Sequence, residues 1–227
     1  MANFNDMEKE DILELISNAI SNNFKRLDLS NRDIQELPNE IGKLTGLEHL
    51  NLCFNRIQTL PPEIGNLKNL KTLLLSRNEI VSLPPEIGNL KRLNLLDLSH
   101  NRILELPDTI GHLSELKTLD ASYGQLQKLP LQFIELLSLK KLYLENNPLT
   151  FPPAKVVKRG LYATMYFLLE KKRKIETSKV ILQVFNIPEK FKEPLNQYIK
   201  CFADIVSTVY EHDMKFEINF LNPTEIH

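Results

Sequence analysis

The chain has 227 residues, with 28 Lys and Arg against 29 Asp and Glu, and a formal net charge of −1 at pH 7. Such a balance gives no overall field that would recruit nucleic acid or an acidic membrane, so neither is expected as a partner. Two cysteines, Cys53 and Cys201, are too few for a disulfide framework and are typical of a reducing compartment. The first residues are acidic where a signal peptide is basic, and no apolar run has the length of a membrane span. We therefore expect a cytoplasmic protein, with export by another signal as the alternative.

Residues 5–22 are predicted to form an amphipathic helix. Its apolar residues recur at three- and four-residue spacing and are Ile12, Leu13, Ile16, Ala19 and Ile20. The first turn of a stacked repeat protein exposes apolar edges that need a cover. Residues 1–23 are therefore predicted to form an N-terminal capping helix rather than a separate partner-binding helix.

A phrase of 23 residues recurs through residues 24–153. Its clearest copies are LEHLNLCFNRIQTLPPEIGNL from Leu47, LKTLLLSRNEIVSLPPEIGNL from Leu70 and LNLLDLSHNRILELPDTIGHL from Leu93, and looser copies begin at Phe24, Leu116 and Leu139. A fixed period in this range is the pattern of a leucine-rich repeat, in which each turn contributes one short strand and one return segment. The predicted fold is therefore α/β: a leucine-rich repeat solenoid of six turns, with a curved parallel sheet on its concave side.

Positions within the 23-residue phrase have distinct predicted roles. The first, fourth, sixth and eleventh are apolar and are expected to point inward. The ninth is an asparagine whose buried amide is expected to bond backbone groups of two neighbouring turns; these residues are Asn55, Asn78, Asn101 and Asn147. Arg32 and Gly124 break this ladder. Arg32 lies in the edge turn, where solvent can substitute, but Gly124 predicts a weak seam.

The return segments carry a second recurring residue. A glycine occupies one position of each, at Gly42, Gly65, Gly88 and Gly111, where the backbone is expected to bend or to approach its neighbour closely. The fifth turn departs from the pattern, with Ile134 in place of the glycine and Ala121 in place of the sixth-position leucine.

The repeat pattern ends at Pro152 and Pro153. Residues 154–175 are predicted to form a C-terminal capping helix whose basic end is a solvated helix end rather than a nuclear signal. Residues 176–227 are predicted to form a small β-α-β unit, with strands at Lys179–Phe185 and at 214–220 and a helix within Pro188–Tyr210. Such a unit is too small to stand alone. It is expected to pack on the solenoid, to continue a sheet or to pair with a second copy, which would make a homodimer.

In this kind of repeat the third, fifth, seventh and eighth positions face the concave side, and equivalent positions stack about 4.8 Å apart. Seven residues near the middle of that surface are candidate partner-binding residues: Phe54, Leu74, Arg77, Leu95, His100, Tyr123 and Tyr143. Aromatic and arginine side chains are enriched in binding hot spots, although scattered exposed apolar residues are normal on any surface. We favour a protein-binding patch.

Catalytic and metal sites are the minority hypotheses. Asp97 and Asp120 lie in adjacent turns and could approach the separation used by retaining glycosidases, but an open face offers nothing to raise the pKa of one of them. His49 and Cys53 lie four residues apart along a strand, roughly 13 Å, which is too far for a shared metal. The sequence contains neither of the glycine-rich phosphate-binding motifs. No enzyme activity, cofactor or metal is therefore predicted.

Several segments of the chain resemble known repeat proteins. LPPEIGNLKNL, LPNEIGKLTGL and LSHNRILELP, with the flanks DILELISNAISNNFKRLDLS and NNPLTFPPAKVVKRGLYATMYFLLEKK, are similar to Ras-group-related leucine-rich repeat proteins and to the repeat region of Roco proteins. The resemblance covers about residues 8–174. It implies a curved solenoid that scaffolds protein partners, often in small-GTPase signalling. No phosphate-binding loop occurs in residues 175–227, so GTPase activity is not implied, and the concave residues belong to no motif of these families.

The predicted function is therefore a non-enzymatic scaffold that recognises a protein partner on its concave face, possible partners being a small GTPase or another signalling protein. The alternative is a regulatory subunit that self-associates through residues 176–227.

Overall fold

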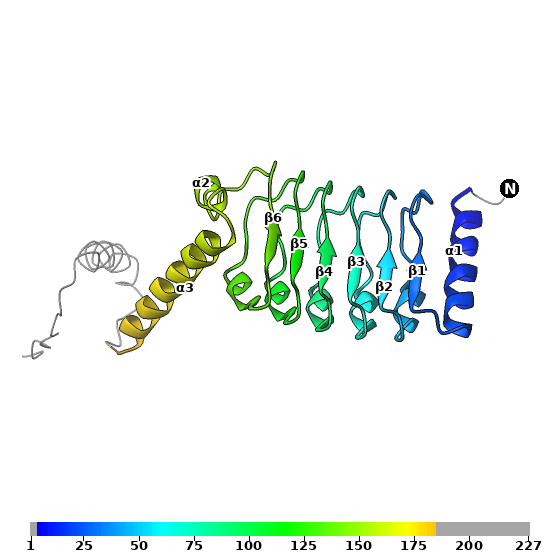
Figure 1. Cartoon of the computed structure of the whole chain (residues 1–227), viewed down its shortest axis with the longest axis horizontal. Coiled ribbons are helices and arrows are strands. Elements are labelled where there is room, and N and C mark those ends of the chain that lie inside the picture. Colours follow the sequence, from blue (N-terminus) through cyan, green and yellow to red (C-terminus); the bar gives the residue numbers. More distant parts are fainter. Residues whose placement is uncertain (1–3, 185–227) are drawn as a thin grey trace, which may run out of the picture. The chain divides into compact units, whose positions relative to one another are not determined.

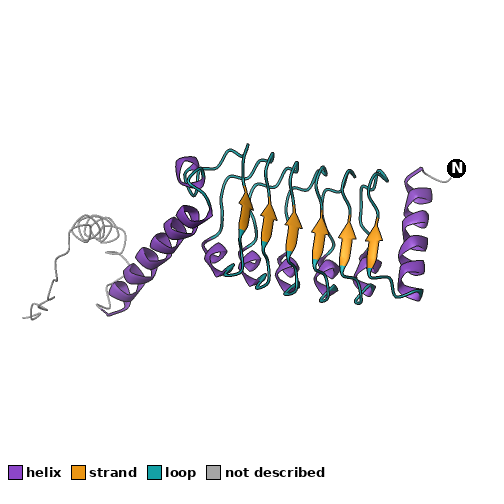
Figure 2. Cartoon of the chain, in the orientation of Figure 1, coloured by secondary structure: helices purple, strands orange, loops and turns teal. Residues whose placement is uncertain are grey.

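The computed structural model describes residues 4–184, with side chains over residues 11–176. It confirms the predicted solenoid, with a parallel sheet on one side and short helices on the other (Figure 1, Figure 2). The strands, in order across the sheet, are β1 Arg26–Asp28, β2 His49–Asn51, β3 Thr72–Leu74, β4 Leu95–Asp97, β5 Thr118–Asp120 and β6 Lys141–Tyr143. Each residue pairs with the one 23 positions later, as Leu50 does with Leu73, so the sequence period sets the register of the sheet.

Short 3₁₀ helices form the side opposite the sheet. They are η1 Asn39–Lys43, η2 Pro62–Asn66, η3 Pro85–Asn89, η4 Asp108–His112 and η5 Leu131–Glu135. A proline precedes each helix in an extended conformation, as Pro61 does with φ −67° and ψ 146°. Because proline fixes φ near this value and has no N–H to satisfy, it directs the chain into the helix at a defined residue.

The leucine and isoleucine positions fill the interior as predicted. Leu50, Leu52 and Ile57 of the second turn are at most 1% exposed. Two positions at the ends differ: Leu142 of the last turn is only partly buried, and Phe24, the first position of the first turn, is 40% exposed. The prediction that this position points inward is wrong there, because no earlier turn exists to cover it.

Close contact between consecutive 3₁₀ helices explains the recurring glycine. A Cβ atom at Gly65 would lie 2.6 Å from the backbone carbonyl oxygen of Glu86, and one at Gly42 would lie 2.8 Å from that of Glu63. A side chain at these positions would therefore force the turns apart. Ile134 escapes this constraint because η5 is the last of these helices, and its side chain packs, partly buried, against the core.

Helix α1, Phe4–Ser21, precedes the first strand and buries one stripe of apolar residues. Ile12, Ile16 and Ala19 are at most 6% exposed, and all three belong to the core cluster. Ile20 is 39% exposed, so its predicted place in the core is wrong. Ile20 lies next to the end of the helix, and the chain turns there so that Ala19 faces the solenoid instead.

The C-terminal side of the repeats differs from the prediction. Two helices, α2 Ala154–Val157 and α3 Leu161–Val184, replace the single helix expected over 154–175, because Gly160 breaks the chain with a φ of +97°. Thr164 and Leu168 of α3 are fully buried.

Helix α3 continues through residues 179–184, so the strand predicted at Lys179–Phe185 is wrong over these residues. The sequence contains neither Gly nor Pro between Gly160 and Pro188, so nothing stops a helix once it has formed. The predicted helix within Pro188–Tyr210 and the predicted strand at 214–220 lie outside the described residues. The chain divides into two compact units, residues 1–170 and 171–227.

No helix in the described part of the chain combines the length and the apolar character needed to cross a membrane.

The buried asparagines form the predicted ladder between turns. Asn78 Nδ2 donates to the carbonyl oxygens of Leu52, at 2.9 Å, and Leu75, at 3.0 Å, while its Oδ1 accepts the Ile57 N–H at 3.0 Å. Asn55, Asn101 and Asn147 make the same set of bonds in their own turns. Each amide therefore ties its turn to the one before it.

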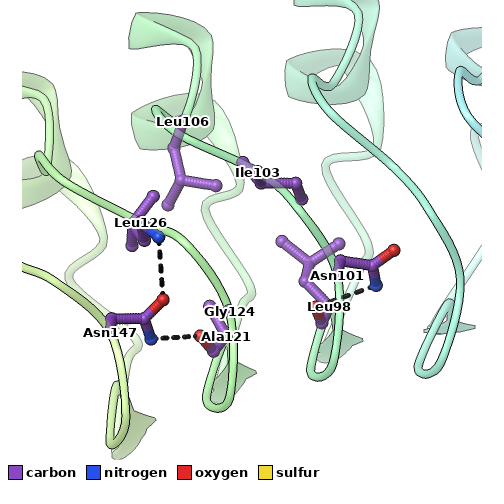
Figure 3. Close-up of a pocket in the computed structure, with 8 residues that line it drawn as sticks. All are labelled: Leu98, Asn101, Ile103, Leu106, Ala121, Gly124, Leu126 and Asn147. Carbon is purple, nitrogen blue, oxygen red and sulfur yellow. Dashed lines mark hydrogen bonds between the residues drawn. The ribbon is translucent and has the colours of Figure 1, made fainter.

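The ladder stops at Gly124, as the sequence predicts. Leu98 O accepts from Asn101 of its own turn, but the next turn offers no amide to it or to the Ile103 N–H. A cavity of about 10 Å³ lies there, bounded by Gly124 and by Ala121, both smaller than the residues at equivalent positions of other turns (Figure 3). The contact between the fourth and fifth turns is thus the least completely bonded of the stack.

Replacing Gly124 with asparagine should restore this rung. The introduced amide would reach Leu98 O, Ala121 O and the Ile103 N–H, but the new Cβ would lie 2.9 Å from Asn147 Oδ1, which must shift slightly. Gly124→Ala adds the same Cβ without the amide. We expect the asparagine variant to unfold with a free energy about 1–2 kcal/mol above that of the alanine variant, measured by urea denaturation. Equal stability of the two variants would show that the seam does not lack a hydrogen-bonding partner.

Candidate partner-binding surface

The seven predicted partner-binding residues all lie on the sheet side of the solenoid, in two groups. Leu74, Leu95 and Tyr143 are strand residues of β3, β4 and β6. Each lies next to a central leucine, which is buried in β3 and β4 and partly buried in β6, and their side chains emerge from the sheet face. The others, Phe54, Arg77, His100 and Tyr123, each lie three residues after the last residue of a strand. We call these four residues the bend stripe.

The backbone at the bend stripe has a left-handed conformation. Phe54, Arg77, His100 and Tyr123 have φ between 54° and 58°, as do Asn31 and Asn146 at the same position of the first and last turns. The Phe54 N–H donates to Ser76 O of the next turn at 3.0 Å, which extends the strand ladder beyond the strand. The following residue then turns inward and places its amide in the asparagine ladder. The conformation is therefore required by the architecture of each turn.

The residue types at these positions do not suit that conformation. A left-handed backbone costs an ordinary L-residue about 1–2 kcal/mol, whereas glycine, asparagine and, to a lesser degree, histidine tolerate it, so the mismatch concerns Phe54, Arg77 and Tyr123. The first and last turns have asparagine, but the four central turns have bulky aromatic, histidine or arginine side chains. Stability alone would favour asparagine in all six turns. Strained residues of this kind are concentrated at functional sites.

The side chains of the bend stripe stack in two pairs. The rings of His100 and Tyr123 are parallel within 4°, with centroids 4.7 Å apart. Arg77 Cζ lies 5.3 Å from the ring centroid of Phe54, a cation–π distance. Phe54 and Tyr123 remain 52% and 55% exposed. The stripe therefore presents ordered but accessible aromatic surface, which lowers the entropy lost when a partner binds.

A shallow hollow of about 290 Å³ lies on the sheet face over β1, β2 and β3. Leu74 forms part of its wall, with Arg26, Asp28 and His49 among the polar residues around it. The Ser30 hydroxyl, followed by the Ser30 backbone N–H, holds the pKa of Asp28 below its ordinary value. The residues at β1 and β2 were not predicted as a site, although the third position of each turn was expected on this face.

Asp97 and Asp120, the candidate catalytic pair, pair in register on β4 and β5. One oxygen of each is already engaged. Asp97 Oδ1 accepts the backbone N–H and the hydroxyl of Ser99, at 2.9 and 2.7 Å, and Asp120 makes the same two bonds with Ser122. These bonds fix the strand ends. They give a structural role to the column of serines at the seventh position of the turn, which are Ser30, Ser76, Ser99 and Ser122.

Cys53 replaces serine in that column and is half-buried. Burial raises the pKa of its thiol, so little of the nucleophilic thiolate exists at neutral pH. In the described part of the chain no group of three or more His, Cys, Asp or Glu side chains is arranged to hold a metal ion.

Two family models match the repeats of this chain. A family model for the "Leucine-rich repeat region" matches residues 13–98, and one for the "Leucine Rich Repeat" matches residues 92–113 and 138–156. None of the curated proteins compared with the chain matches it.

Two solved structures illustrate the likeness. The plant peptide hormone receptor RGFR1, in complex with RGF2, is 33% identical with a TM-score of 0.52, over 56% of this chain and 21% of the receptor chain. The ectodomain of the plant membrane receptor kinase GASSHO1/SCHENGEN3 from Arabidopsis thaliana, in complex with CASPARIAN STRIP INTEGRITY FACTOR 2, is 42% identical with a TM-score of 0.48, over 51% of this chain and 14% of that one. The chain thus spans about a fifth or less of each of these proteins.

The strained backbone of the bend stripe leads us to predict how a substitution there changes the free energy of unfolding. Phe54→Asn removes the Arg77 contact, worth about 0.5–1 kcal/mol, but relieves a left-handed backbone cost of about 1–2 kcal/mol. We expect its free energy of unfolding to equal or exceed that of the unmodified chain by up to about 1 kcal/mol, by urea denaturation. As a contrast, truncating the fully buried Phe133 to alanine should lower it by about 3–5 kcal/mol. A loss above about 1 kcal/mol in Phe54→Asn would contradict the strain argument.

Proposed function

We propose that this chain, a leucine-rich repeat protein, is a non-enzymatic scaffold that binds a protein partner on its concave face, through the bend stripe and the neighbouring sheet residues. The observation that carries the proposal is the placement of three bulky side chains, those of Phe54, Arg77 and Tyr123, where the backbone favours asparagine. These side chains lower the stability of the free chain, and that cost is explained if they contribute binding free energy in a complex.

The composition and exposure of the surface support the same function. The stripe joins two exposed aromatic rings to an arginine and a histidine, and Leu74, Leu95 and Tyr143 continue the apolar surface onto the sheet. Tyrosine and arginine are the residue types that contribute most to protein–protein hot spots. Because the stripe spans four consecutive turns, a partner can contact all of its members at once.

The likeness to a receptor solved with a bound peptide hormone supports recognition of a polypeptide. Three further proposals come from the sequence. We propose that the partner is a small GTPase or another signalling protein and that the chain belongs among the Ras-group-related or Roco-type repeat proteins. We also propose a cytoplasmic location. The alternative prediction, a regulatory subunit that self-associates through residues 176–227, concerns a segment that lies mostly outside the described residues.

The double variant Arg77→Ala with Tyr123→Ala tests the proposal. It removes one member of each stacked pair, so we expect capture of the partner from cell extract to fall at least about tenfold, measured by quantitative mass spectrometry after affinity purification. Its far-UV circular dichroism should be unchanged, because both side chains lie outside the core.

The matched control is Arg159→Ala with Tyr162→Ala, which removes the same two residue types from exposed positions, one just before α3 and one in its first turn. The control should capture the partner normally. Normal capture by Arg77→Ala with Tyr123→Ala would reject the concave-face model.

A further inference from the structure

The residues at and just before the start of each strand form a second surface, which we call the basic rim. It comprises the second and third positions of each turn and the last two positions of the preceding turn. Its nine cationic residues are Lys25, Arg26, Lys68, Lys71, Lys91, Arg92, Lys117, Lys140 and Lys141, and its two acidic residues are Glu48 and Glu115. A chain whose overall net charge is −1 therefore concentrates positive charge on one edge of the sheet.

Backbone hydrogen bonds place these residues along one continuous edge. The Glu48 N–H donates to Lys25 O at 2.9 Å and the Lys71 N–H to Glu48 O at 2.7 Å, and the same bond recurs in later turns until the Lys140 N–H reaches Lys117 O at 2.9 Å. Equivalent rim residues thus recur at the strand spacing of about 4.8 Å. The rim follows the tail ends of the strand arrows (Figure 1).

The two edges of the sheet differ in how their charges are compensated. Beyond the strand ends, cations pair with acids, as in Arg56 with Asp33 at 2.6 Å and Arg102 with Glu79 at 3.0 Å. On the rim, Lys25 and Lys91 instead donate to backbone carbonyls and Arg92 donates to the Asn69 amide oxygen. These acceptors are neutral, so they satisfy hydrogen bonds without adding an opposite charge.

Glu48 lies in a positive electrostatic potential at the rim. It pairs with Lys71 at 2.6 Å. The hydrogen bond from Lys71 lowers the pKa of this carboxyl, and the charges of Lys71, Lys25 and His49 lower it further. The acid is therefore surrounded by cations.

The density of positive charge is greatest at Lys117, Lys140 and Lys141. The backbone N–H groups of Lys140 and Lys141 both donate to Lys117 O, at 2.9 and 3.0 Å, so the three side chains begin close together, and all three are exposed. In the described part of the chain no ion pair joins them to an acid. Leu137, three residues before Lys140, is 90% exposed, and Tyr143 lies two residues after Lys141 on β6.

We propose that the basic rim, centred on Lys117, Lys140 and Lys141, docks an acidic segment of the protein partner. The inference builds on the proposed function and adds the chemistry of the partner: carboxylates for the rim, followed by apolar or aromatic residues for the bend stripe. Charge complementarity of this kind directs the approach of a partner and fixes its register.

An acidic polypeptide fits the surface better than a nucleic acid or a membrane does. The rim positions contain no aromatic ring of Phe, Tyr or Trp on which a base could stack, which nucleic-acid grooves commonly use. A single exposed leucine is too little apolar surface to anchor the chain in a bilayer. A polypeptide can supply acidic and apolar residues in one segment. From the rim to the stripe is six residues along the strand direction, or roughly 20 Å, which an extended segment of about six residues spans.

The probe is a synthetic fluorescein-labelled peptide of about 14 residues, with an Asp/Glu half and a Phe/Leu half joined by a short Gly-Ser spacer. Two comparison peptides replace the acidic half with serine or with lysine. Binding to the full chain is measured by fluorescence anisotropy at about 50 mM and about 300 mM salt. We expect the acidic peptide to bind at least about tenfold more tightly than either comparison peptide at low salt, and this advantage to shrink at high salt.

The test variant is Lys117→Glu, Lys140→Glu and Lys141→Glu, which should weaken binding of the acidic peptide by at least about tenfold. The matched control, Lys155→Glu, Lys158→Glu and Arg159→Glu, makes the same charge change on and just after α2 and should change binding by less than about twofold. Circular dichroism confirms folding of both, and a milder variant with glutamine at the three rim positions should fall between the control and the reversal.

The outcomes distinguish binding through the basic rim from binding through the bend stripe. Unchanged binding by the rim variant, with binding lost in Phe54→Ala with Tyr123→Ala, overturns the rim and leaves the proposed function standing. Binding lost in the rim variant alone supports the rim and removes support for the stripe. Tighter binding of duplex DNA or of phosphatidylserine vesicles than of the acidic peptide would overturn the inference, because the rim would then select phosphate rather than carboxylate.

Discussion

The fold depends on the buried amides of the asparagine ladder, which four of the six turns contribute. A 23-residue turn encloses too little apolar volume to be stable alone, and its curved backbone leaves N–H and C=O groups that no strand partner reaches. The ninth-position asparagine satisfies groups in its own turn and in the previous one, so stability is shared between neighbours. The glycine of the return segment adds a second constraint, since the absence of a Cβ lets consecutive 3₁₀ helices approach closely.

The elements that follow from this periodic constraint were predictable from the sequence. The strands, the inward leucines and the asparagine ladder all repeat at a fixed spacing, so each copy supports the others and the interruption at Gly124 stands out against them. Predictions failed where the period ends. Phe24 has no preceding turn, and residues 179–184 carry β-branched side chains that favour a strand, but no residue there stops the helix that begins at Leu161.

The candidate site was predictable in its residues and not in its geometry. The positions of Phe54, Arg77, His100 and Tyr123 follow from the register, but these residue types give no sign of a left-handed backbone. Only Asn31 and Asn146, at the two ends of the column, suggest it. The basic rim is present in the sequence but becomes a surface only when residues 23 positions apart are stacked. In a parallel, in-register sheet, residues of one type at one repeat position form a continuous strip. The basic rim and the bend stripe are such strips, at opposite ends of the strands.

The interrupted ladder and the bend stripe meet between the fourth and fifth turns. Inside the solenoid, Gly124 leaves this junction without its amide; on the surface, the parallel rings of His100 and Tyr123 cross the same junction. Tyr123 is the residue immediately before Gly124, so the stacked rings and the missing rung belong to the same bend. A partner that contacts both rings holds the two turns together from outside. In the proposed complex, binding at the stripe is therefore linked to the least completely bonded contact in the stack, because the partner would supply a constraint that the free chain lacks there.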